Sequence, residues 1–192
     1  MANRWTQAAT ILPPTIKVCG KRLLPFSLRH RVALEAIDSP ILSLDKAFGA
    51  LDVIRAVRIL ASHNLEEMRV DQMTFLEGYH LQRMRWSKRL LKIEAYKLMV
   101  YFGEQSLWPR FWEKDSEGHG SNGGFPWELS VVAALVRNGH STEEAWTMPE
   151  SAAIWLHMAH AKAAGSKVDI VSEDEWSAME KHKLEMASKS AA

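Results

Sequence analysis

The sequence predicts a mainly α protein, a helical bundle with a small N-terminal β-hairpin. Apolar residues recur every three or four positions over most of residues 27–164, which is the period of amphipathic helices. Ser or Thr followed three residues later by Glu, as in Ser141 with Glu144, repeatedly marks helix starts. Only residues 15–26 alternate in the manner of strands. A chain of 192 residues suits one core, or one core with a small subdomain.

The composition is that of a soluble intracellular protein. Hydrophobic residues make up 47% and the formal net charge is +1, so no global field draws the chain towards nucleic acid or a membrane. No apolar run approaches the roughly 18 residues of a membrane span, and no secretory signal is expected. Cys19 is the single cysteine, which excludes an intramolecular disulfide. Eight Trp and nine Met suit a core or a protein-binding surface.

The first elements are set by local signals. Gly20 permits a tight turn within the 15–26 hairpin. Ser27 is the expected N-cap of a helix over 27–37, which the Asp38-Ser39-Pro40 sequence ends. The expected buried face of this helix consists of Val32, Ala33, Ala36 and Ile37.

Three further helices are expected in the N-terminal part. The first spans 44–62, and its buried face holds Ala50, Ile54, Val57 and Ala61, with Val53 and Leu60 beside them. Asn64 with Glu67 resembles a capping box that opens a short helix. A single long helix over 78–102 carries two apolar stripes, so we expect it to lie at the centre of the bundle. The first stripe holds Met84, Leu91, Ala95, Leu98 and Phe102, and the second holds Trp86, Leu90, Ile93 and Tyr101.

Three regions follow from this pattern. Residues 1–112 form an N-terminal hairpin and helical unit, 113–125 a Gly-rich linker or loop, and 126–192 a C-terminal helical unit. The C-terminal helices are expected at 126–138, 141–146, 149–164 and 172–187, with an extended link at 168–171. The hydroxyl of Thr147 is expected to cap the 149–164 helix by accepting from the Glu150 amide, and Ser172 with Glu175 to cap the last helix.

Motifs of catalysis and cofactor binding are absent from the sequence, so we expect neither an enzyme nor a bound cofactor. There is no GxSxG, Walker A or GxGxxG sequence. Basic neighbours could lower the pKa of Cys19, although a structural cysteine is the favoured interpretation. His157 and His160 are three apart on a helix, but no acidic residue between 151 and 163 completes a metal site, so no metal is expected.

Two sets of residues are candidate contacts with a partner. The turn between the 141–146 and 149–164 helices offers an apolar set, which either packs inside the C-terminal unit or binds another protein. Its members are Trp146, Met148, Trp155 and Met158. The predicted long helix offers a basic set, which contacts phosphate or an acidic partner or is simply a solvated face. Its members are Arg85, Lys88, Arg89 and Lys92.

One feature of the sequence favours a nucleic-acid function, because residues 133–156 have the outline of a helix-turn-helix motif. The candidate recognition helix begins Pro149-Glu150-Ser151 and continues with apolar residues. A groove-reading helix should instead begin with Arg, Lys, Asn or Gln. Nucleic acid is therefore an unfavoured partner, and we expect no membrane partner.

Two segments resemble small phage and prophage proteins of the tail-assembly type. In residues 125–165 the resemblance rests on Glu144, Ala145, Trp146, Met148, Pro149, Ala153, Trp155 and Gly165. In residues 23–42 it rests on Pro25, Phe26, Ser27, His30, Leu34, Ser39 and Pro40. The resemblance implies a non-enzymatic, helical tail assembly chaperone in the bacterial host cytoplasm, which binds the tape-measure protein or tail-tube subunits. The alternatives are a structural virion component, such as a connector or minor tail protein, and a helix-turn-helix regulator.

Overall fold

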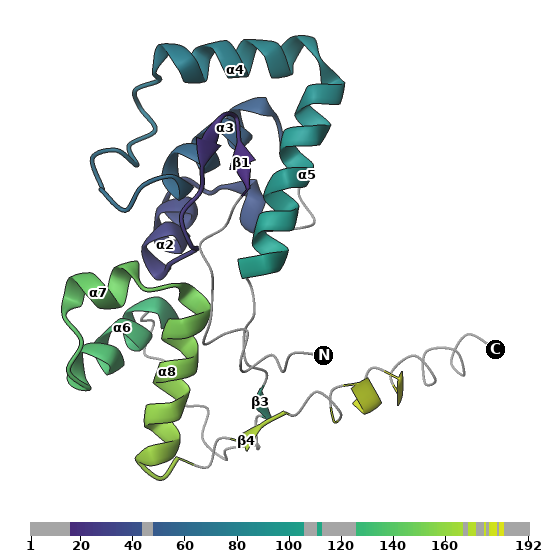
Figure 1. Cartoon of the computed structure of the whole chain (residues 1–192). Helices are drawn as coiled ribbons and strands as arrows, with labels where there is room; N and C mark the ends of the chain where they lie inside the picture. The colour runs from purple at the N-terminus through teal and green to yellow at the C-terminus, as the bar shows by residue number, and fades with distance from the viewer. Residues whose placement is uncertain are drawn as a thin grey trace.

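The computed structural model describes residues 16–43, 48–105, 111–112, 126–166, 169–171, 175, 177–179 and 181–182. These residues are mainly helical, with a small two-stranded antiparallel hairpin at the N-terminal end (Figure 1), as predicted. A larger hydrophobic cluster lies among the hairpin and helices α2 to α5, and a smaller one lies among helices α6 to α8.

The hairpin pairs β1 (Lys17–Val18) with β2 (Lys21–Arg22). Its two turn residues, Cys19 and Gly20, have φ angles of 48° and 78°. Two consecutive residues in the left-handed region make the turn that matches the twist of a two-residue hairpin, and glycine adopts this region without strain. The predicted hairpin is therefore confirmed.

Helix α2 (Leu28–Ala36) has the predicted start but a different buried face. The Ser27 hydroxyl accepts from the His30 amide, and the His30 ring accepts in return from the Ser27 amide. The buried residues are Leu28, His30 and Leu34, whereas Val32 is exposed. Of the predicted face, Ala33 and Ile37 pack partly buried against the larger cluster, whereas Val32 and Ala36 are exposed. The buried face includes the polar His30, whose Nε2 lies 2.8 Å from the Ser62 carbonyl oxygen. A 3₁₀ helix, η1 (Pro40–Leu42), follows the predicted stop.

Helix α3 (Ala50–Leu60) is the central helix of the larger cluster. It begins at Ala50, where the Asp52 carboxylate accepts from the Gly49 amide at 2.8 Å, and not at residue 44; residues 44–47 lie outside the described part. The predicted face is buried at Ala50, Ile54 and Val57, as are Val53 and Leu60, predicted beside it, while Ala61 is partly buried. Two further residues, Ala56 and Ile59, are buried as well.

The capping box predicted at Asn64 and Glu67 does not form. Glu67 accepts instead from the Ser62 hydroxyl at 2.5 Å, and residues 65–68 form turns. The prediction of a short helix here was wrong, since the carboxylate that should cap it is engaged by a residue on the preceding turn.

The predicted long helix over 78–102 is two helices, α4 (Phe75–Trp86) and α5 (Lys88–Gln105). Ser87 separates them with an extended backbone, and its hydroxyl accepts from the Leu90 amide at 3.3 Å. In Figure 1, α4 forms the top edge of the molecule, and α5 turns sharply from its end to run down beside the hairpin and α3. The 78–102 segment is thus a bent pair at the edge of the bundle, not its central helix.

The C-terminal helices are α6 (Trp127–Arg137), α7 (Thr142–Thr147) and α8 (Glu150–Ala163), close to their predicted bounds. The Ser141 hydroxyl accepts from the Glu144 amide, as predicted. Apolar residues of α6, α7 and α8 form the smaller cluster, which Leu28 of α2 joins. The division of the chain at 113–125 stays a prediction, because that segment lies outside the described residues.

Residues after α8 are described only in part. Of the predicted extended link, residues Asp169–Ile170 form a strand (β4) that pairs antiparallel with Phe111–Trp112 (β3). Of the predicted helix at 172–187, the six described residues are helical. Its Ser172 cap lies outside the described residues.

The start of α8 differs from the prediction. Thr147 is the last residue of α7, and its hydroxyl donates to the Glu143 carbonyl at 2.9 Å. The Glu150 amide donates instead to the Phe26 carbonyl at 2.6 Å, within a bridge between Ser27 and Pro149. A backbone group from residue 26 thus takes the position that the sequence assigns to Thr147.

Candidate functional site

The predicted apolar contact residues are all partly buried. Trp146 and Met148 pack against the smaller hydrophobic cluster with Trp127 and Leu156, so each is partly buried within the C-terminal helices. Trp155 and Met158 are partly buried on α8. The turn at 146–149 therefore packs largely on its own protein.

The two most exposed large apolar side chains of the described residues, Phe75 and Trp86, lie elsewhere, on α4. Phe75 is 91% exposed, Trp86 79% and Tyr79 52%, and Leu76 beside them is 55% exposed. Phe75, Tyr79 and Trp86 occur at spacings of four and seven, which puts all three on one face of the helix. This face is opposite the buried residues of α4, so an aromatic row about 16 Å long faces solvent.

Beyond the bend at Ser87, helix α5 carries a second set of exposed apolar side chains. Tyr96 is 67% exposed, and Met99 and Ile93 lie near it with about half of their side chains exposed. We name this set the α4–α5 surface: Phe75, Leu76, Tyr79, Trp86, Ile93, Tyr96 and Met99. Large exposed apolar side chains that share one face of a helix, as they do on α4 and again on α5, are typical of interaction sites, whereas scattered ones are not.

The predicted basic residues lie at the bend within this surface. Arg85, Lys88, Arg89 and Lys92 are all exposed, and Arg83 joins them with its guanidinium 5.4 Å from the centre of the Tyr79 ring. We name these five residues the basic cluster. No carboxylate of the described residues pairs with any of them, so their charges face solvent or a partner.

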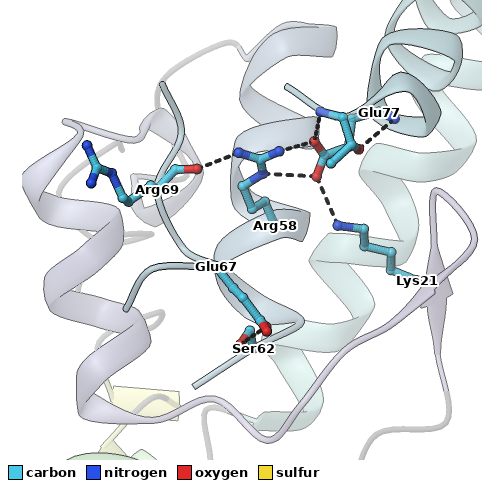
Figure 2. A network of polar contacts seen from close by, with 7 residues as sticks. Lys21, Arg58, Ser62, Glu67, Arg69 and Glu77 are labelled. Atoms are coloured by element: carbon cyan, nitrogen blue, oxygen red, sulfur yellow. Dashed lines mark hydrogen bonds and ion pairs between the residues drawn. The ribbon is translucent and has the colours of Figure 1, made fainter. Parts of the chain in front are cut away.

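The nearby carboxylates are directed inwards, which accounts for the excess of positive charge. Glu77 on α4 is only 4% exposed and pairs with Arg58 of α3 and Lys21 of the hairpin (Figure 2). Glu94 on α5 is buried too, accepting from the Cys19 amide and from Lys97, each at 2.7 Å. These two glutamates fasten α4 and α5 to the core by their inner faces.

Glu77 has a strongly perturbed pKa. Burial of its carboxyl raises the pKa, but the bonds donated by Arg58, Lys21 and the Thr74 backbone outweigh burial and lower the pKa to about 2. All its neighbours favour the charged form, which is the behaviour of a structural ion pair and not of a general base at neutral pH. A pocket of about 650 Å³ opens beside it, lined by residues that include Arg22, Glu66 and Gln72. Two of the guanidinium groups at this pocket are engaged, Arg58 by Glu77 and Arg69 by Asp71, whereas Arg22 is exposed.

A second buried ion pair holds α8 against α2. Glu150 is fully buried and bonds to Arg31, whose guanidinium lies 5.4 Å from the Phe26 ring centre and 5.5 Å from that of Trp127. Ser151 and Ala153 are buried beside it. Since the start of α8 is enclosed by its own protein, α8 is not placed to enter a DNA groove as a recognition helix.

The Cys19 thiol and the His157–His160 pair lack the surroundings of a reactive group or a metal site. Burial and the Glu94 carboxylate raise the pKa of the Cys19 thiol to about 12, so basic neighbours do not activate it. Burial and His160 lower the pKa of His157. Within the described ranges, no group of three or more His, Cys, Asp or Glu side chains is arranged to hold a metal ion. The same residues include no helix with the length and apolarity to cross a membrane.

Comparison of the chain with protein-family models, with curated proteins and with solved structures finds no match. The resemblance to phage tail-assembly proteins therefore stays a prediction.

The sequence predicts the basic residues of the α4–α5 surface but not the exposure of its apolar residues. The four predicted basic residues do share it, and the stripe of Trp86 and Ile93 was recognised as apolar. A single unbroken helix with two apolar stripes would bury both, so the sequence predicts a core position for this one. Two apolar stripes on one predicted helix were the available signal, because two shorter helices that bury different faces produce the same pattern.

Proposed function

We propose that the protein is a non-enzymatic assembly factor that binds another protein through apolar helical surfaces, in the production of phage or prophage tails. The observation that carries this proposal is the α4–α5 surface, where Phe75, Trp86 and Tyr96 each expose two thirds or more of their area. Tyr and Trp are enriched at binding hot spots because each buries a large apolar area while ordering few torsions. The resemblance of residues 23–42 and 125–165 supports the choice of process.

The partner we propose is the tape-measure protein or a tail-tube subunit. A tape-measure helix has apolar stripes that need cover until the tube closes around it, and an exposed aromatic surface provides such cover. The exposed methionine Met99 adds an adaptable contact. Trp155 and Met158 stay predicted contacts of the same partner, while Trp146 and Met148 support the fold of the C-terminal helices.

The test is to produce the full chain together with a phage tape-measure protein and a tail-tube subunit, and to purify both the soluble complex and the finished particles. We expect the chain to copurify with the tape-measure protein or the tube subunit, to raise the soluble yield of that partner, and to be missing from the particles. Trp86→Ser should weaken the complex, whereas Leu129→Ser, at an exposed position of α6, should leave it intact.

Three outcomes would reject this role. Retention of the chain in particles would make it a structural virion component. Tight, salt-sensitive binding to duplex DNA would favour the regulator. Failure to bind either tail protein would remove the proposed process.

A further inference from the structure

We infer that the segment bound by the α4–α5 surface is an acidic amphipathic helix. This inference rests on the proposed use of that surface for binding protein, and it adds the chemistry of the partner. It follows from the charge of the bend between α4 and α5, from the mixing of cations with apolar groups there, and from the charge that a second copy would bring.

The first argument is the charge. The basic cluster places five cations between residues 83 and 92, and no acidic residue lies in that interval. The flanking acidic residues already have partners. Glu77 pairs with Lys21 and Arg58. Glu94 pairs with Lys97 and accepts from the Cys19 amide. The chain as a whole has a net charge of only +1, so this is a local excess that an acidic partner would neutralise.

The second argument is the mixing of the two kinds of side chain. Arg89, Lys92, Tyr96 and Met99 follow one another at spacings of three, four and three, so cations and apolar groups share one face of α5. On α4, Arg83 lies over the ring of Tyr79 in the same way. A matching partner has an apolar stripe bordered directly by carboxylates, which is the pattern of an acidic amphipathic helix.

The third argument concerns other occupants. A second copy of the chain would bring its own basic cluster to a symmetric interface, where like charges repel. Single-stranded nucleic acid would stack its bases on the aromatic rings, but stacking would leave the aliphatic side chains of Leu76, Ile93 and Met99 exposed to water. An apolar stripe on a helix covers both kinds of group, so protein is the occupant that the surface fits.

The test uses the full chain and a synthetic 18-residue helix with Leu at heptad a and d positions and Glu at the exposed positions. Three matched peptides have Gln or Lys in place of Glu, or the acidic composition in scrambled order. Calorimetric titration should give tight binding for the acidic helix, at least tenfold weaker binding for the Gln helix and the scrambled peptide, and none for the Lys helix. Higher salt should weaken the acidic complex.

Variants then place the binding site on the chain. Arg89→Glu with Lys92→Glu should weaken the acidic helix at least tenfold and create binding of the Lys helix, a reversal that misfolding cannot produce. Trp86→Ser should weaken both peptides. The matched control, Arg137→Glu with Lys162→Glu, reverses two exposed cations of α6 and α8 and should change nothing.

Several outcomes would overturn the inference. Equal binding of the acidic and Lys helices would show that charge plays no part. Tighter binding to oligo-dT or to vesicles of anionic lipid would assign the surface to nucleic acid or membrane. Self-association that Trp86→Ser abolishes would assign it to a second copy.

These results are separable from the proposed function. If the acidic helix binds but neither tail protein does, the surface still takes an acidic helix and the phage role fails. If a tail protein binds through Trp86 but is indifferent to Arg89→Glu with Lys92→Glu, the assembly role stands and the acidic partner is rejected.

Discussion

The substitution Glu77→Gln tests how α4 is held on the protein. Glu77 accepts from Arg58 and Lys21 and also from the Thr74 amide, so one buried carboxylate joins α4 to α3 and to the hairpin. Glutamine keeps the shape of the side chain but removes its charge and leaves two cations without a counter-ion. Such losses are costly in buried ion pairs because the remaining charge stays desolvated.

The magnitude follows from the pKa of Glu77, which is about 2 in the folded protein against an ordinary value of 4.5. Because the folded-state pKa is the lower one, the charged carboxylate stabilises the fold fully above pH 4.5. This contribution is lost as the pH falls from 4.5 towards 2. The difference corresponds to about 3 kcal/mol of unfolding free energy at neutral pH, and about half of it is lost by pH 3.5.

Urea unfolding of the wild type and of Glu77→Gln, followed by circular dichroism at pH 7 and at pH 3.5, measures both quantities. We expect Glu77→Gln to be less stable by about 3 kcal/mol at pH 7, with a difference roughly halved at pH 3.5. The exposed Glu104→Gln is the matched control and should change stability by less than about 0.5 kcal/mol. A difference under about 1 kcal/mol at pH 7, or one that is the same at both pH values, would refute the reasoning.

Three further predictions concern other parts of the fold. Burial lowers the pKa of His30 to about 4, so protonation costs about 3 kcal/mol of stability as the pH falls from 6.5 to 4; a urea titration across this range should show that slope, and His30→Gln should flatten it. Trp146→Ala should destabilise the protein by about 2–3 kcal/mol in thermal melts, whereas Thr147→Ala should cost under about 0.5 kcal/mol because its hydroxyl caps no helix; similar losses would contradict this geometry. Ser87→Ala should cost about 1 kcal/mol by removing the cap of α5, and an unchanged melting temperature would argue against that bond.

The part of the fold that the sequence determined by itself is the part set by neighbouring residues. A Ser hydroxyl reaches an amide only three residues away, so the starts of α2 and α7 could be predicted from Ser27 and Ser141. Gly20 marked the hairpin turn in the same way, because the turn geometry involves only adjacent residues. The buried face of α3 was predictable as well, since an unbroken apolar period has one direction in which to pack.

Only the tertiary structure decided which group pairs with which across the chain. The Thr147 hydroxyl and the Phe26 carbonyl are both possible acceptors for the Glu150 amide at the start of α8. The packing of α8 against residues 26–27 gives that bond to the Phe26 carbonyl. The bend at Ser87 was decided likewise, because α4 buries Glu77 and Met84 while α5 buries Glu94 and Leu98 on a face out of phase with the first. The buried residues Glu77, Glu94 and Glu150 each have a partner 19 to 119 residues away, and a pattern of period three or four contains no information at that range. The position of Trp86 on the surface is the consequence: the sequence makes it part of an apolar stripe with Tyr101, but the bend leaves Trp86 in solvent while Tyr101 is buried.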